Sequence, residues 1–250
     1  MQEIKNIIAS IASVSLEDVN SVGLMNRVDT KFIFHKRLLP QLLISMKDQY
    51  AVMEIKGERL MPYRSDYYDT DSFQMLRWHH NGKLNRYKIR KRKYLLTGET
   101  FLEVKFKNNK GKTEKYRKLS SGNDSADRDF ILEKTPFSIP QLNHVMNNQF
   151  DRIMLLNNNK KERITIDLDV GFSNGDDHYK HLEDLVVLEI KSERNSGSTS
   201  LKKALKEAKI YPASFSKFVT GMYMHHKDLK YNRFKVRIMT INRILEKNIL

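Results

Sequence analysis

Alternating polar and apolar residues predict β-strands in eight segments of the chain. These segments are rich in β-branched and aromatic residues and are bounded by Gly, Asn and Asp, which is typical of strands. They cover residues 27–34, 61–69, 84–94, 100–108, 113–119, 152–158, 163–172 and 183–192. Short turn sequences at 97–98 and 108–111 connect neighbouring segments, and such tight links favour an antiparallel sheet over parallel βαβ units.

Apolar residues spaced three or four apart predict helices around this sheet. An N-terminal amphipathic helix carries Ile4, Ile7, Ile8 and Ile11 on one face. A second helix covers 36–49, where Pro40 falls in the first turn and is tolerated. Weaker periodicity covers 71–80, 125–133, 138–149, 200–209 and 214–225. The polar residues 120–128 predict a mobile loop.

The last segment, residues 226–250, is basic and carries a helical stripe formed by Phe234, Ile238, Ile241 and Leu245. Such a helix either packs against the body of the protein or lies on an anionic membrane surface or a protein partner. We favour packing. The sequence therefore predicts one α+β domain over residues 1–225, an antiparallel β-barrel with flanking helices, followed by a basic amphipathic helix over 226–250.

Charged residues of both signs alternate along one face of six predicted strands. Side chains at i, i+2 and i+4 of a strand share a face, and the opposite faces are apolar, as at Leu102 and Val104. A solvated outer face is the common reason for such a pattern, but the apolar opposite faces favour a barrel with the charges inside. The sets are Arg27, Asp29 and Lys31; Lys88, Arg90 and Arg92; Glu103, Lys105 and Lys107; Lys115 and Arg117; Arg163, Thr165, Asp167 and Asp169; Glu189 and Lys191.

The composition fits an interior that binds an anion. The 250 residues include 45 Lys and Arg against 30 Asp and Glu, a formal net charge of +15, and no cysteine. Buried cations need a counter-charge, and a triphosphate supplies about four negative charges and oxygens that suit the Arg fork. The carboxylates are ligands suited to Mg²⁺ or Mn²⁺. Without cysteine there is no disulfide or thiolate chemistry, which fits a cytoplasmic location, and no apolar run approaches the ~20 residues of a membrane span.

Several common catalytic patterns are missing. Residues 111–113 read Gly-Lys-Thr, but the earlier glycine of a phosphate-binding loop is replaced by Phe106, so we expect a turn between two strands. Neither an HExxH nor a GxSxG motif occurs. We interpret the pairs His79–His80 and His225–His226 as surface histidines.

The order of several short motifs resembles the polyphosphate polymerase domain of the vacuolar transporter chaperone (VTC) family, within the triphosphate tunnel metalloenzymes of the CYTH-like superfamily. The resemblance spans about residues 20–225. It rests on R-x-D-x-K-F at 27–32, SDYYD at 65–69, RKRKY at 90–94, FLEVKFK at 101–107, Arg152, RITID at 163–167, VLEIK at 187–191 and PASFSKF at 212–218.

This resemblance implies a tunnel that binds ATP, another triphosphate or polyphosphate, and an enzyme that passes the γ-phosphate of ATP to a growing polyphosphate chain. It implies phosphate binding by Lys31, Arg90, Arg92, Lys105, Arg152 and Lys217, with secondary roles for Arg117, Arg163 and Ser216. It also implies Mn²⁺ or Mg²⁺ ligation by Glu189, and secondarily by Glu103.

Two departures from the family pattern bear on these roles. Hydrolytic members of the superfamily begin with E-x-E-x-K, whereas this chain has Arg27 and Asp29 at the acidic positions. Loss of these acidic metal ligands weakens the hydrolase interpretation. The tyrosine expected two places before Arg152 is Phe150, which removes one hydrogen bond to phosphate.

The sequence is therefore compatible with three functions. The favoured one is a polyphosphate polymerase, and the second is a triphosphatase, which differs only in using water as the acceptor. The third is a non-catalytic module that binds polyphosphate or another polyanion. We do not expect nucleic-acid binding, because the interspersed carboxylates would repel a phosphate backbone and such proteins present open basic faces with stacking aromatics.

Overall fold

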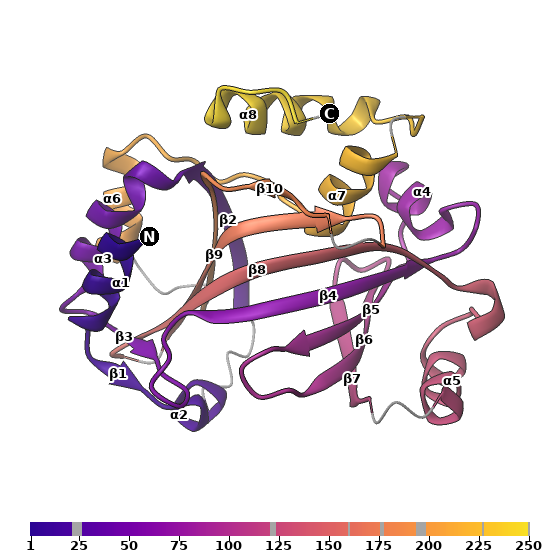
Figure 1. Cartoon of the computed structure of the whole chain (residues 1–250), viewed down its shortest axis with the longest axis horizontal. Coiled ribbons are helices and arrows are strands. Elements are labelled where there is room, and N and C mark those ends of the chain that lie inside the picture. The colour runs from indigo at the N-terminus through magenta and orange to yellow at the C-terminus, as the bar shows by residue number, and fades with distance from the viewer. Residues whose placement is uncertain are drawn as a thin grey trace.

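The computed structural model describes residues 1–21, 27–120, 124–159, 161–175, 178–193, 199–226 and 228–249. Within these residues, eleven strands join into one curved sheet (Figure 1). The main path runs through β2 (Arg27–His35), β11 (Leu185–Glu193), β9 (Glu162–Ser173), β8 (Asn143–Asn157), β4 (Met61–Asp69), β5 (Arg86–Tyr94), β6 (Thr100–Lys107) and β7 (Thr113–Leu119). Shorter strands β1 (Ser13–Val14), β3 (Tyr50–Met53) and β10 (Lys180–Leu182) extend it.

Every pairing along the main path is antiparallel. The predicted α+β fold, an antiparallel β-barrel with flanking helices, is confirmed in its class and strand direction, and the sheet curves around a central cavity. The path ends at β2 and β7, which do not pair in the described part of the chain, so the curved sheet stays open along this seam.

Helices cover the outer, apolar face of the sheet in two groups. At one end, α1 (Gln2–Ala9), α3 (Leu39–Met46) and α6 (Ser200–Glu207) pack on β8, β9 and β11, with Ile166 and Leu188 fully buried beneath them (Figure 1, left). At the other end, α4 (Gln74–His80) and α5 (Asp124–Lys134) cover β5 and β6, where Ile89 and Leu102 are buried. The apolar faces therefore point outward, as the alternation predicts.

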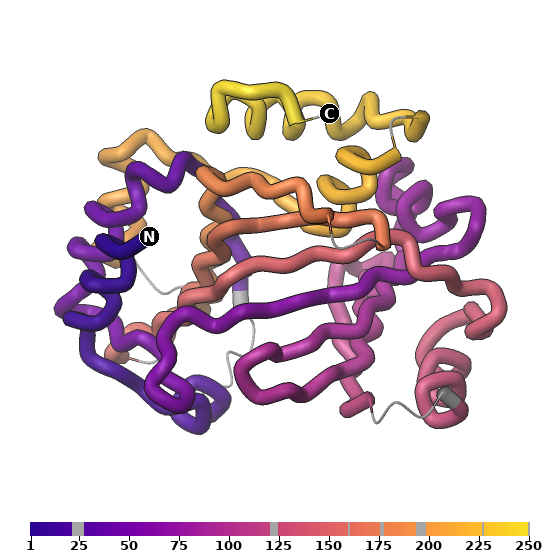
Figure 2. The backbone as a smooth tube through the Cα atoms, in the orientation of Figure 1, coloured from indigo at the N-terminus to yellow at the C-terminus, as the bar shows by residue number. Residues whose placement is uncertain are grey.

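Short elements connect these layers: α2 (Leu16–Ser21) and the 3₁₀ turns Lys36–Leu38, Ile139–Gln141 and Asn232–Phe234. Pro40 lies in the first turn of α3, as expected. Figure 2 shows the chain passing from the N-terminal helices at the left edge, through the sheet, to the C-terminal segment along the top. The two ends of the chain thus lie on different sides of the sheet.

Helix α7 (Lys217–His225) lies against β8 and β9 on the concave side. Its Gly221 allows this close approach: a Cβ atom there would lie 2.6 Å from the Phe172 ring and 2.8 Å from the Met146 sulfur. A larger residue would push the helix away. The contact fixes the start of α7, with Ser216 and Lys217, over the cavity.

Helix α8 (Lys235–Leu245) packs on β2 and β11. Phe234, Ile238 and Ile241 are at most 5% exposed, and Leu245 is half-buried against the same core. The packed interpretation of the C-terminal segment is thus supported, since most of the stripe is covered. In the described residues no helix is long and apolar enough to cross a bilayer. The boundary at residue 225 stays a prediction.

Two sequence-based assignments are wrong. The helix expected over 138–149 is a single 3₁₀ turn followed by β8, which begins at Asn143 because β4 and β9 pair with it there. The loop expected over 120–128 is in part the start of α5: Asp127 is buried and accepts a hydrogen bond from Ser120. Residues 121–123 lie outside the described part of the chain.

Candidate active site

The concave side of the sheet encloses a cavity of about 640 Å³. Its described lining holds eleven Lys and Arg side chains and five Asp and Glu side chains, which leaves an excess of six positive charges. All the residues predicted from the sequence to bind phosphate or metal line it: Lys31, Arg90, Arg92, Glu103, Lys105, Arg117, Arg152, Arg163, Glu189, Ser216 and Lys217. The structure brings them together, while their roles stay predictions.

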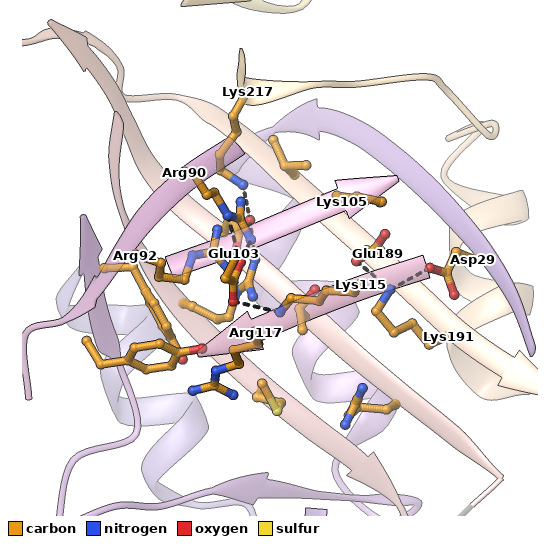
Figure 3. A pocket seen from close by; sticks show the side chains of 18 of the residues that line it. Asp29, Arg90, Arg92, Glu103, Lys105, Lys115, Arg117, Glu189, Lys191 and Lys217 are labelled. Carbon is orange, nitrogen blue, oxygen red and sulfur yellow. Dashed lines mark hydrogen bonds and ion pairs between the residues drawn. The ribbon is translucent and has the colours of Figure 1, made fainter. Parts of the chain in front are cut away.

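Glu189 is the centre of one ion-pair cluster, at the edge formed by β2 and β11 (Figure 3). Its Oε1 accepts from Lys31 Nζ at 2.7 Å, and its Oε2 lies 2.9 Å from Lys191 Nζ. Lys191 also donates to Asp29 Oδ2 at 2.7 Å. Burial alone would raise the pKa of Glu189, but the two lysines outweigh it and lower that pKa to about 2. The carboxylate is therefore ionised at any working pH.

Glu103 on β6 organises a second cluster. Arg90 donates to its Oε2 from Nε at 2.8 Å and Nη2 at 2.6 Å, and Lys115 lies 2.7 Å from its Oε1. Burial opposes ionisation of Glu103, but these cations, Arg90 above all, hold its pKa well below the usual range. Burial also lowers the pKa of Lys115 to about 8, against the pull of Glu103.

Asp167 on β9 joins the third cluster. Arg152 donates to it through two bonds, at 2.6 Å and 2.9 Å, and Lys217 at the start of α7 donates to the same carboxylate. The pKa of Asp167 is lowered because Arg152 and Lys217 outweigh its burial. Burial lowers the pKa of Lys217 to about 8 although Asp167 opposes this.

Four further cations have no carboxylate within ion-pair distance in the described residues: Lys88, Arg92, Lys105 and Arg117. Lys88 donates to Ser216 Oγ at 3.1 Å and Arg92 to Ser65 Oγ at 3.2 Å. Arg117 lies 3.5 Å over the Phe101 ring. Burial and neighbouring cations lower the pKa values of Lys88 and Lys105, and that of Arg92 to about 10. Among the described residues, the positive charge of this part of the cavity is therefore not balanced by carboxylates.

Aromatic rings back the cations at one side of the cavity. Tyr63 and Phe150 stack with ring centroids 5.3 Å apart, and Arg92 and Arg152 lie over both rings. Lys217 Nζ lies 4.1 Å from the Phe150 centroid. Where the family pattern has a tyrosine, Phe150 thus supplies a ring face that attracts cations in place of a hydroxyl that could reach phosphate.

Comparison with known proteins assigns the family. The model of the VTC domain matches residues 26–126 and 131–226. The chain belongs to the VTC domain family. No curated protein matches this VTC domain.

The fold of this VTC domain is shared by a solved structure, and two further structures resemble it with lower scores. The protein HpAC1 from Hippeastrum, described as an adenylyl cyclase with a dominant triphosphatase activity, is 14% identical with a TM-score of 0.51, covering 78% of this chain and 94% of its own. A protein from Vibrio parahaemolyticus, described as an adenylate cyclase, is 11% identical with a TM-score of 0.44, covering 77% and 96%. A protein from Pyrococcus furiosus is 12% identical with a TM-score of 0.42, covering 76% and 97%.

The carboxylates of the VTC domain fit a divalent ion only together with phosphate. No group of three His, Asp or Glu side chains suited to a metal occurs in the described residues. Asp29 and Glu189 nevertheless converge on one point, the Lys191 ammonium. Mg²⁺ and Mn²⁺ accept one or two carboxylates completed by water and substrate phosphates, so this pair fits. Glu103 fits less well, because it is 2% exposed and both oxygens hold cations.

The sequence left several lining residues of the VTC domain without a role. Lys88, Lys115, Asp167 and Lys191 all contact predicted site residues. The signal for them was present, since each lies two or four positions from a predicted site residue on the same strand face. Their pairing across strands, in contrast, depends on register, which a single strand does not reveal.

The alternation fails at Asp169. This residue has φ +49° beside a register shift between β8 and β9, so β9 carries an extra residue there. Leu168 packs with the outer helices, whereas Val170 and Phe172 pack in the cluster that contains α7. Asp169 bonds to His181 at 2.8 Å and does not line the cavity, in contrast to the sequence prediction.

All four histidines interpreted as surface residues are half-buried, and His226 contacts the Phe73 ring. His79 and His80 on α4 are half-buried and contact Phe234. Burial, reinforced by nearby cations, lowers the pKa of His79 to about 2, so it stays neutral. None of the four paired histidines lines the cavity.

Proposed function

We propose that this VTC domain is a polyphosphate polymerase that transfers the γ-phosphate of ATP to a growing polyphosphate chain. The observation that carries the proposal is the group of cations that have no carboxylate partner among the described residues, in a cavity with six excess positive charges. A phosphate chain supplies both the charge and the many acceptor oxygens that Arg and Lys prefer.

The cations of the cavity fall into two groups: one group has no carboxylate contact among the described residues, and the other is held in a fixed position by carboxylates. Arg92, Lys88 and Lys105 form no ion pair with a carboxylate in the part of the chain that the structure describes, and they bind phosphate oxygens directly. Arg90, Arg152 and Lys217 are held in place by Glu103 and Asp167. Phosphoryl transfer depends mainly on such positioning and on neutralising charge.

The reaction needs no additional co-reactant. The bond between the γ-phosphorus and the β,γ-bridging oxygen breaks, and its electron pair remains on ADP. A terminal oxygen of the acceptor chain forms the new P–O bond, which lengthens the chain by one phosphate. A divalent ion held by Glu189 and phosphate oxygens would neutralise charge on the transferred group.

Transfer to water is the second candidate function, because HpAC1 is described as a triphosphatase. Hydrolysis benefits from a general base whose pKa lies near neutral. Three carboxylates of the cavity, Glu103, Asp167 and Glu189, are all ion-paired and have lowered pKa values, which makes them weak bases. An acceptor phosphate is already ionised, so this electrostatic pattern favours the polymerase.

The test is an incubation of the purified protein with ATP and Mn²⁺ or Mg²⁺, followed by separate measurement of long-chain phosphate, free phosphate and ADP. The polymerase predicts one phosphate in polymer for each ADP formed. Free phosphate without polymer identifies a triphosphatase. Binding of polyphosphate without any ADP identifies a non-catalytic module and refutes both enzymes.

We place the reaction in the cytoplasm, where ATP is available, and propose that it involves no nucleic acid.

A further inference from the structure

Lys191 occupies the point at which two carboxylates of the cavity converge. Its Nζ lies 2.7 Å from Asp29 Oδ2 and 2.9 Å from Glu189 Oε2 (Figure 3). The geometry follows from the sheet, because β2 and β11 pair Asp29 with Lys191 directly. The Lys191 side chain is only 14% exposed, so its ammonium is held between the carboxylates.

A lysine in this position neutralises the two carboxylates, as a bound metal ion would. Two carboxylates that face one point repel each other unless a cation lies between them. A divalent ion would bind the same oxygens at about 2.0–2.2 Å, so it cannot share the space with the ammonium. The second oxygen of Glu189 is also engaged, by Lys31 at 2.7 Å.

We propose that Lys191 is a resident cation that keeps this carboxylate pair closed to divalent ions until a phosphate chain draws the ammonium away. The inference rests on the proposed binding of a metal and a polyphosphate in this cavity. Phosphate oxygens compete with Asp29 and Glu189 for the Lys191 ammonium, and the released carboxylate oxygens then accept the metal. Metal and polyanion therefore bind with positive coupling, each strengthening the other.

Lys191 would thus act as a specificity-determining residue. As long as no phosphate chain is bound, free divalent ions are kept out of a site that already has a cation. The ion that enters arrives with the phosphate chain, whose negative charge compensates the added positive charge in an already cationic cavity.

The experiment measures Mn²⁺ binding to the protein without nucleotide or polyphosphate, by the loss of the free Mn²⁺ signal in electron paramagnetic resonance. Lys191→Met removes the resident cation and should bind Mn²⁺ about tenfold or more tightly than the wild type. Lys191→Arg keeps the charge and should bind as weakly as the wild type. Lys206→Met, on the exposed side of α6, is the surface control.

A double variant tests whether the gain in Mn²⁺ affinity depends on the Asp29 carboxylate. Asp29→Asn combined with Lys191→Met removes one carboxylate and should lose the gain in affinity. Lys191→Gln replaces Lys191→Met if the latter does not fold, as checked by circular dichroism. The proposal is overturned if the uncharged variants bind Mn²⁺ no more tightly than the wild type, or if the double variant keeps the gain. Because no turnover is measured, these outcomes are independent of whether the enzyme polymerises or hydrolyses.

Discussion

Lys217, the first residue of α7, forms an ion pair with Asp167 on β9. The contact joins the C-terminal part of the chain to the wall of the cavity, and Arg152 holds the other oxygen of the same carboxylate. Lys217 is therefore a cation whose position is fixed before any ligand binds, and its protonation state depends on its buried surroundings.

The first prediction concerns pH. Burial lowers the pKa of Lys217 to about 8, and an anionic ligand nearby stabilises the protonated form and raises this pKa again. Binding of tripolyphosphate above pH 8 should therefore take up protons, and affinity should fall as the pH rises from about 8 towards 10. Calorimetry at pH 8.5 in two buffers of different ionisation enthalpy measures the uptake.

Lys217→Met should take up fewer protons than the wild type. Some uptake should remain, since Lys115 also has a pKa of about 8. Lys206→Met, exposed on α6, should match the wild type. Equal uptake in Lys217→Met and wild type would show that Lys217 does not titrate on binding.

The second prediction concerns Glu189. Replacing it by Gln removes the carboxylate that Lys31 and Lys191 hold, and should abolish turnover that depends on a divalent ion. Binding of tripolyphosphate without metal should persist, because the substitution adds net positive charge to the cavity. Turnover is followed by ADP release, and Glu183→Gln, at an exposed position outside the cavity, serves as control. Full metal-dependent activity in Glu189→Gln would exclude this residue from the mechanism.

The sequence predicts most of the sheet and the inward face of its strands because both depend on alternation, whereas Arg152, Ser216 and Lys217 were named only through the family resemblance. Arg90, Lys105 and Glu189 lie on three different strands, yet each was assigned to the inside by its own neighbours two positions away. Alternation could not predict the β-bulge at Asp169. One extra residue in β9 shifts the alternation there and turns the Asp169 side chain away from the cavity. The start of β8 was also missed, because Val145 and Met146 have an apolar spacing that a helix shares and only pairing with β4 decides it.

The third prediction separates packing from exposure on α8. Ile241 is 2% exposed, whereas Met239, on the same helix, is 54% exposed. Ile241→Ala should lower the free energy of unfolding by about 2–4 kcal/mol, and Met239→Ala by less than about 0.5 kcal/mol. Chemical denaturation measures both. Equal effects would mean that α8 does not pack as described, and would return the membrane or partner interpretation of this segment to consideration.

The last prediction distinguishes the two arginines of the segment that reads Arg-Lys-Arg. From the sequence alone, both would be expected to cost stability without ligand. The structure distinguishes them: Arg90 forms an ion pair with the buried Glu103, whereas Arg92 forms no ion pair in the described residues and donates a hydrogen bond to Ser65. Arg90→Ala should therefore lower the free energy of unfolding by about 3 kcal/mol, because it removes a partner of a buried charge. Arg92→Ala removes a buried cation without an ion pair and should change it by less than about 1 kcal/mol.

Both arginine variants should lose most of the rise in melting temperature that tripolyphosphate causes in the wild type, because ligand stabilisation follows affinity. Lys91 is unsuitable as the control, since it pairs with the buried Asp127 at 3.0 Å and its removal would destabilise the protein for another reason. Lys93 is exposed and outside the cavity, so Lys93→Ala should keep both the stability and the ligand-induced shift. Thermal unfolding of the three variants with and without tripolyphosphate decides the matter. A full shift in Arg92→Ala, together with a lost shift in Lys93→Ala, would show that the inward face of β5 has been assigned to the wrong residues.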